Sequence, residues 1–512
     1  MLQGWAATEK IFRGRRAVGL WCAHMEFNFK PHRTNRVHLT AVPTVCLALL
    51  CMTLPPPNSH GQSPEALRIT NAQPTSAGLN LAWTSAGSNV AYSVQSRAAF
   101  AESLWLLPPA TNPWPIAATH WTDPSSATNG SRFYRVIAVP AAQRGKIITN
   151  QAGTAYTTNV ISVLLSGAGV PLSPQYPVRL HKLVYETIDP LGARTIASAA
   201  LAIPQGVGKP LPLFSYQHGT LTRTNEAPSA LSVFGEAGVA LAIATSGYVA
   251  VLPDFLGMGV SPGLHPYHHA RSEATACVDA LRAARNWCAI SNVTLNGQLF
   301  LAGYSQGGHA TMALHRELEW YHTNEFTITA SAPMAGAYDL SGVTAEDSLS
   351  RRPQPNPYYF AYLLAAYQSV YQLAPSLSDL LVAPYDTTIP PLFNGNSTSG
   401  QINQAMPTNA VPIDILKPEF IADFQTNHNN LLRQALRDND LYAWTPRAPM
   451  QMYHCAGDQD VIPANSQVAF TNFQARGATQ VQFFDPQPSA DHGDCAIPSL
   501  LAAKGWFDSL KQ

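Results

Sequence analysis

Hydrophobic and polar positions follow two successive patterns along the chain. In residues 62–165, short alternating runs such as Leu79–Trp83 and Arg132–Val139 recur between turn signals. Strands of this length and spacing predict a small β-sandwich. From Val178 onward, continuous apolar runs of strand length alternate with stretches of helical periodicity. This second pattern is typical of a mainly parallel sheet with helices on both faces, so we expect an α/β domain over residues 166–512.

The predicted α/β domain begins with a hairpin. Val178–Ile203 should form two antiparallel strands around the turn Asp189–Gly192. The strands expected after it are Leu211–Tyr216, Tyr248–Leu252, Gln298–Ala302, Phe326–Ser331, Met450–Cys455 and Thr479–Phe484, and the expected helices are Ser272–Trp287 and Gly308–Tyr321.

The alternation of strands and helices stops at residues 341–444. This stretch carries Pro-rich and aromatic helical segments such as Tyr358–Tyr367. About a hundred residues between two sheet strands is too long for a loop. We therefore expect a helical cap subdomain, inserted before the strand Met450–Cys455.

Residues 1–61 have the pattern of a leader with a secretory signal peptide. Basic residues precede the apolar run Leu39–Leu54, and a polar exit follows it. The run is shorter than the ~20 residues that a membrane-spanning helix needs. We expect cleavage near Gln62 and a secreted or periplasmic protein, with an uncleaved anchor as the alternative. Met25 directly precedes the basic region, which makes it a candidate for the true start.

The composition excludes some classes of function. Lys plus Arg and Asp plus Glu each total 31, and the formal net charge is zero. Without a basic excess to neutralise phosphates, nucleic-acid binding is excluded as the main role. The 46% of hydrophobic residues is far too high for a disordered chain. The sequence has no phosphate loop or dinucleotide fingerprint, so we expect no cofactor.

A candidate nucleophile lies in the segment Gly303–Gly308, which reads Gly-Tyr-Ser-Gln-Gly-Gly. The segment follows the predicted strand Gln298–Ala302 and opens a helix, which is the context that the G-x-S-x-G motif requires. A tight turn there strains Ser305 and exposes its Oγ, and the helix N-terminus favours developing negative charge. Ser305 is therefore the predicted nucleophile.

A serine nucleophile needs a base and an orienting acid. With this motif they follow the serine along the chain, the acid before the base, each on a loop after a later strand. His492 follows the last predicted strand and is the predicted base. The loop after Met450–Cys455 offers two carboxylates, Asp458 and Asp460, and local spacing does not decide between them.

Hydrolysis also needs donors for the oxyanion, usually backbone N–H groups. One comes from the residue after the nucleophile, Gln306, and the other from the loop after an earlier strand. That loop is Gln217–Thr220, so the N–H of Thr220 is the predicted second donor.

Three histidines, His265, His268 and His269, form a cluster that invites comparison with a metal site. No cysteine or paired carboxylate ligand lies near them in the sequence, and Pro266 interrupts the cluster. We therefore expect them to pack beside the mouth of the active site and to bind no metal.

Five segments, taken in order, resemble the secretory lipase family, meaning the lipase-A type of yeasts and its bacterial α/β-hydrolase relatives. They are Ser215–Thr220, Gly247–Gly259, His265–Tyr267, Gly303–Gly308 and Asp491–Cys495. The resemblance covers about residues 175–510. It implies an α/β-hydrolase fold, hydrolysis of carboxylic esters and a large cap before the acid strand. The family pattern His-x-x-x-Asp-x-x-Val aligns with His454 to Val461, which favours Asp458 as the acid.

The β-domain has a separate resemblance. The layout of Trp83, Tyr92, Trp105 and Phe133–Val136 is similar to fibronectin type III-like modules of bacterial secreted enzymes. We expect Trp83 and Tyr134 to fill its core, with polysaccharide binding by exposed aromatic side chains as the alternative.

Four cysteines follow the predicted leader. Cys277 and Cys288 lie about 16 Å apart on one predicted helix and cannot bridge. Cys455 precedes Asp458 by three residues and Cys495 follows His492 by three, a reach of at most about 10 Å. Both thiols should thus lie near the contact between acid and base. We predict a Cys455–Cys495 disulfide, with two buried free thiols as the alternative.

These features predict a secreted serine hydrolase that cleaves small-molecule or lipid carboxylic esters through an acyl-enzyme. A peptidase or amidase using the same residues is one alternative. A carbohydrate-binding or adhesion protein that acts through the β-domain is another. The cap is the surface that we expect to contact a lipid interface.

Overall fold

The computed structural model describes residues 49–52, 67–98, 103–108, 114–124 and 132–512, and for residues 49–52 it describes the backbone alone. The predicted cleavage site near Gln62 and the candidate start Met25 lie outside the described residues. No helix in the described ranges combines the length and apolar character that crossing a membrane requires.

A nine-stranded sheet forms the centre of the α/β domain, in the order β15-β14-β13-β12-β10-β11-β9-β8-β7. In this order, every neighbouring pair from β15 to β11 is parallel. The pairs β11-β9, β9-β8 and β8-β7 are antiparallel. The strands are β7 Ile147–Tyr156, β8 Val178–Ile188, β9 Arg194–Pro204, β10 Leu211–Gln217, β11 Val249–Pro253, β12 Leu295–Tyr304, β13 Ala330–Met334, β14 Met450–Tyr453 and β15 Val481–Phe484.

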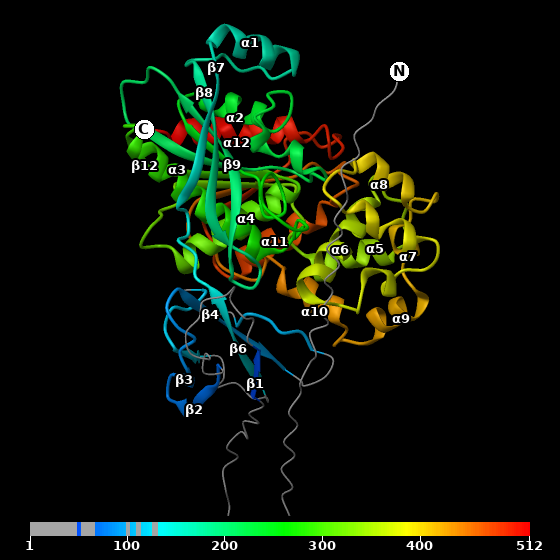
Figure 1. Cartoon of the computed structure of the whole chain (residues 1–512). Helices are drawn as coiled ribbons and strands as arrows, with labels where there is room; N and C mark the ends of the chain where they lie inside the picture. The colour runs from blue at the N-terminus through cyan, green and yellow to red at the C-terminus, as the bar shows by residue number, and fades with distance from the viewer. Residues whose placement is uncertain (1–48, 53–66, 99–102, 109–113, 125–131) are drawn as a thin grey trace, which may run out of the picture. The chain divides into compact units, whose positions relative to one another are not determined.

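Helices cover both faces of this sheet (Figure 1). On one face α1, α2 and α12 share a core with the strands, and on the other face α3 and α4 do so. The helices are α1 Thr158–Gly167, α2 Ala237–Ala244, α3 Ala270–Ile290, α4 Gln306–Tyr321, α11 Ala464–Ala475 and α12 Ala496–Leu510. The predicted α/β-hydrolase fold is confirmed. Apolar strands such as β11, buried along their whole length, need cover on both sides.

Between β13 and β14 the chain forms a set of helices with a hydrophobic core of their own, coloured yellow to orange in Figure 1. They are α5 Ala345–Leu349, α6 Tyr358–Tyr371, α7 Tyr385–Thr388, α8 Ser399–Ala405, α9 Pro418–Thr426 and α10 Leu431–Asp438. Aromatic residues of α6, among them Tyr362 and Tyr367, are buried in this core. This is the region in which the sequence predicts a cap.

The N-terminal β-domain contains two three-stranded sheets, β1-β6-β4 and β2-β3-β5. Their strands are β1 Leu49–Met52, β2 Ile69–Thr75, β3 Gly78–Trp83, β4 Val90–Arg97, β5 His120–Asp123 and β6 Phe133–Pro140. Trp83 and Tyr134 are buried in the shared core, which confirms their predicted place. Strand β1 lies in the predicted leader, so cleavage near Gln62 would leave β6 paired with β4 alone.

The domain boundary predicted at residue 165 differs from the structure. Strand β7, which the sequence pattern assigns to the β-domain, pairs with β8 in the large sheet, and α1 packs Ile161 and Leu165 against the same domain. Strand β7 is an edge strand whose side chains are mostly exposed, so it carries little hydrophobic pattern. Only its long-range pairing with β8 assigns it to the α/β domain.

Candidate active site

Ser305 lies at the sharp turn between β12 and α4. Its backbone has φ 61° and ψ −121°, a strained conformation for a residue other than glycine. Two neighbouring glycines are required by close packing. A Cβ on Gly307 would lie 1.9 Å from the carbonyl O of Gln217, and one on Gly308 would lie 2.1 Å from that of Met334. The strained turn is thus held between strands β10 and β13.

A chain of hydrogen bonds runs from Ser305 to an acid on another loop. The Oγ of Ser305 lies 2.8 Å from Nε2 of His492, and Nδ1 of His492 lies 2.6 Å from Oδ2 of Asp458. A carboxylate can only accept, so Nδ1 carries the hydrogen and Nε2 presents a lone pair to the serine. His492 follows β15 and Asp458 follows β14, as the sequence predicts. This arrangement can remove a proton from Ser305 and later return it.

Asp458 is fully buried and highly connected. Its Oδ1 accepts hydrogen bonds from the N–H groups of Asp460 and Val461, both at 2.9 Å. Its Oδ2 accepts from Nε2 of His454 at 3.1 Å as well as from His492. Burial would raise the pKa of Asp458, but the hydrogen bonds and charges of His454 and His492 outweigh it and hold that pKa far below the ordinary value. Asp458 is therefore ionised and can stabilise an imidazolium on His492.

Asp460, the alternative acid, lies in a different environment. Both of its carboxylate oxygens accept from the side-chain amide of Asn356, at 3.1 and 3.0 Å. Burial raises the pKa of Asp460. Its carboxylate thus binds a residue just before α6 rather than the imidazole that contacts Ser305.

Of the two residues predicted to bind the oxyanion, Gln306 follows Ser305 directly, and Thr220 lies in the loop whose Gly219 approaches Ser305. Gly219 is near enough that an added Cβ would be 4.0 Å from the Cβ of Ser305. In the part of the chain that the structure describes, the N–H groups of Thr220 and Gln306 make no hydrogen bond. The side chain of Thr220 is held by a 2.8 Å hydrogen bond between its Oγ1 and the hydroxyl of Tyr267. Two free amides next to a nucleophile can bind a developing oxyanion.

A disulfide joins Cys455 and Cys495, whereas Cys277 and Cys288 are buried free thiols on α3. The bridge links the loop that carries Asp458 to the start of α12, directly after His492. It therefore ties the loop of Asp458 to that of His492.

We expect removal of this bridge to destabilise the protein measurably. It closes a loop with a sequence separation of 40 residues, which on the chain-entropy model contributes roughly 4 kcal/mol. The C455A/C495A variant should lose about that much free energy of unfolding, measured with urea at equilibrium. Wild-type protein treated with dithiothreitol should fall to the same value, while the variant should not respond to dithiothreitol. Equal stability of oxidised wild type and variant would contradict the expectation.

An apolar cavity lies within the cap beside these loops. Its lining includes Leu340, Phe360, Leu363, Ile413, Phe424 and Leu436. Asp460 and Val461, from the loop of Asp458, also line it, as does Tyr267, which bonds to Thr220. The cavity thus adjoins both the loop of Asp458 and the loop of Thr220, although Ser305 and His492 are not among its lining residues.

The three histidines of the cluster, predicted to pack beside the mouth of the active site, are all buried. Nδ1 of His265 bonds to the carbonyl of Leu256, and His269 caps the N-terminus of α3 through the N–H of Ser272. His268 lies against His309, with ring centroids 4.7 Å apart. Two polar residues of this region, Glu273 and His309, were not singled out from the sequence. The sequence signal that could have identified them is their place on the helices. Glu273 lies one turn into α3, and His309 lies one turn after Ser305.

Comparison with known proteins gives consistent results. Residues 228–323 match the family model for secretory lipase. The crystal structure of the rice cell wall degrading esterase LipA from Xanthomonas oryzae is 31% identical in sequence, with a TM-score of 0.65 over 72% of this chain and 97% of that one. A crystal structure of a Legionella pneumophila protein is 26% identical, with a TM-score of 0.66 over 71% of this chain and 98% of that one.

Candida antarctica lipase A is 18% identical, with a TM-score of 0.52 over 72% of this chain and 83% of that one, and it supports the fold alone. No curated protein sequence matches the chain. The fold and these relatives define the class of protein, which is a carboxylic ester hydrolase of the α/β-hydrolase fold. The chain belongs to the secretory lipase family.

Proposed function

We propose that the protein is an exported serine esterase that forms an acyl-enzyme. Ser305 attacks the ester carbonyl, His492 takes its proton, and Asp458 orients and stabilises the imidazolium. The N–H groups of Thr220 and Gln306 bind the oxyanion. The observation that carries the proposal is the continuous hydrogen-bond chain from Ser305 through His492 to buried Asp458.

The proposed reaction uses only these groups and a water molecule. As the tetrahedral intermediate collapses, Nε2 of His492 returns the proton to the leaving alkoxide and an acyl group remains on Ser305. Water activated by the same histidine then releases the acid. Export is supported by the leader pattern before Gln62 and by the disulfide, a feature of oxidising compartments.

The substrate that we propose is an ester with an apolar acyl chain, because the cap cavity beside the two loops is lined mainly by aliphatic and aromatic side chains. Contact of the cap with a lipid interface belongs to this proposal. Contact of the β-domain with polysaccharide is also part of this proposal. The aromatic residues Trp83 and Tyr134 are buried, so they cannot form the contact surface.

A series of p-nitrophenyl esters from acetate to palmitate tests the substrate class. Each methylene that enters the cavity adds about 0.8 kcal/mol, so kcat/KM should rise up to about fourfold per CH₂ until the cavity is full. Leu363 lines the cavity from α6. The variant Leu363→Trp should lower kcat/KM for the longer esters and leave that for acetate nearly unchanged. A flat chain-length profile in the wild type would reject the cavity as the acyl site.

Matched ester and anilide substrates separate the esterase from a peptidase or amidase. We expect turnover of the ester and none of the anilide with the same acyl group. Comparable rates on both would favour the amidase alternative.

A further inference from the structure

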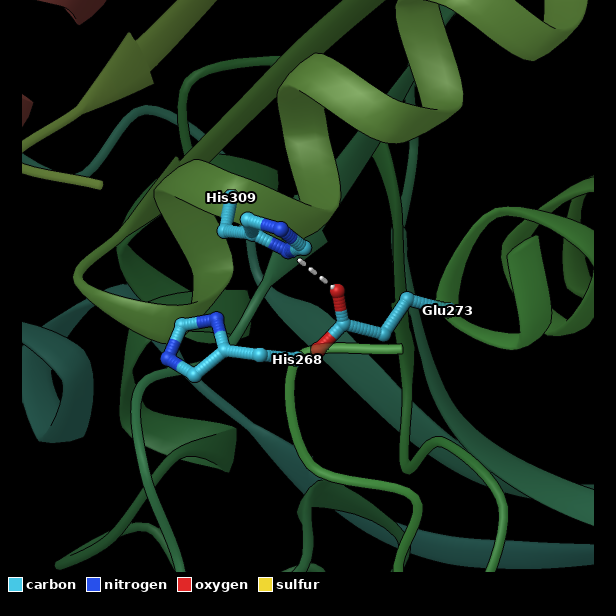
Figure 2. Close-up of side chains that lie close together, drawn as sticks. All are labelled: His268, Glu273 and His309. Carbon is cyan, nitrogen blue, oxygen red and sulfur yellow. Dashed lines mark hydrogen bonds and ion pairs between the residues drawn. The ribbon is translucent and has the colours of Figure 1, made fainter. Parts of the chain in front are cut away.

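Three buried side chains from three segments converge behind the nucleophile turn. His268 lies in the loop before α3, Glu273 on the first turn of α3, and His309 on the first turn of α4, shortly after Ser305. Their ligand-type atoms all lie within 4.8 Å of one another (Figure 2). All three residues are buried, so this group does not belong to a solvated surface.

The contacts of His309 place either a proton or a metal ion between it and Glu273. Nε2 of His309 lies 3.2 Å from the carbonyl O of Asn439, which can only accept, so Nε2 carries a hydrogen. Nδ1 lies 2.7 Å from Oε2 of Glu273. Two lone pairs would face each other at this contact unless a proton or a metal ion lay between them.

His268 distinguishes a metal ion from a proton. Its Nδ1 is buried and has no hydrogen-bond partner, and only 6% of the residue is exposed. Figure 2 shows its ring turned toward His309 with a nitrogen on that side. A proton on His309 would satisfy Glu273 and leave His268 unpartnered, whereas a metal ion would engage all three groups.

We propose that His268, Glu273 and His309 bind one divalent transition-metal ion, and that the ion is Zn²⁺. Two imidazoles and one carboxylate form a ligand set that zinc prefers, while Mg²⁺ and Ca²⁺ prefer oxygen ligands alone. The outer contacts also fit a metal site. The carbonyl of Asn439 orients His309, and Nε2 of Gln306 donates to Oε1 of Glu273 at 2.8 Å, leaving Oε2 for the ion.

The position of the site suggests a structural role. The ion would link the loop before α3 to α3 and to the first turn of α4, which follows Ser305 directly. It would thereby hold the turn that presents the Gln306 N–H. No step of ester hydrolysis is assigned to it.

The test measures metal content of the full-length protein. Protein stripped with EDTA and dialysed against Zn²⁺ should retain one zinc per chain by mass spectrometry, and Zn²⁺ should raise its Tm. The variants His268→Gln and Glu273→Gln should each weaken retention by at least about tenfold, since even outer-shell changes cost that much at metal sites. His428→Gln makes the matched change at an exposed histidine and should retain the zinc.

X-ray absorption of the wild-type zinc protein makes the test independent of how the variants fold. We expect two imidazoles and oxygen in the coordination shell. Three results would overturn the site: less than a tenth of an equivalent of zinc in the wild type, a shell without two imidazoles, or equal retention in a folded His268→Gln variant.

Discussion

The variant Ser305→Ala should lose at least about 10⁴-fold in kcat/KM on p-nitrophenyl butyrate, because the acyl-enzyme cannot form without its oxygen. The variant should also fail to react with an organophosphonate probe that labels the wild type. Ser350→Ala makes the same change at an exposed serine and should keep wild-type rates.

Combining substitutions tests whether Ser305 and His492 act as a unit, as the 2.8 Å contact between them indicates. Residues of one catalytic unit are strongly non-additive. The double variant Ser305→Ala/His492→Ala should therefore be scarcely slower than Ser305→Ala alone. Retained activity or labelling in Ser305→Ala would remove this serine from the mechanism. If the fold-loss in the double variant equals the product of the two single fold-losses, the two residues do not act as a unit.

The second large effect concerns the acid. In Asp458→Asn the side chain keeps its size but loses the charge that fixes the tautomer of His492, and we expect kcat to fall by about 10⁴-fold. The matched change two residues along, Asp460→Asn, should leave most of the activity, because Asp460 bonds to Asn356 and not to His492.

Steady-state rates on one ester, measured for both aspartate variants beside the wild type, decide between the two carboxylates. A larger loss in Asp460→Asn than in Asp458→Asn would move the role of the acid to Asp460. Circular dichroism of both variants controls for the loss of structure that removing the buried charge of Asp458 could cause.

Several elements of the fold could be read from local sequence because each has its own apolar run. Strands β10, β11, β12 and β14 and helices α3 and α4 lie within a few residues of their predicted bounds. The strand predicted at Phe326–Ser331 is instead β13, Ala330–Met334. Phe326 and Ile328 are buried in the core without being strand residues. Apolar character alone therefore did not separate a buried connection from a strand, and pairing with β12 decided the register.

Short elements with weak patterns were missed. Helix α1 is short and contains β-branched residues, which have low helix propensity. Packing of Ile161 and Leu165 against the α/β domain stabilises it. Tertiary contacts therefore override the local preference, as they also do for strand β7.

For the candidate site, the sequence by itself determined the positions of Ser305 and His492 as predictions, because a strand followed by a tight glycine-rich turn and a helix is a local signal. Local spacing did not separate Asp458 from Asp460, and the family resemblance favoured Asp458. The tertiary structure adds what each side chain faces, because Asp458 contacts His492 whereas Asp460 contacts Asn356. Only the tertiary structure brought Glu273 and His309 to His268, since these ligand-type groups come from segments that meet through packing of α3 against α4. Spacing along a chain reports local geometry, whereas contacts between loops depend on the whole sheet that positions them.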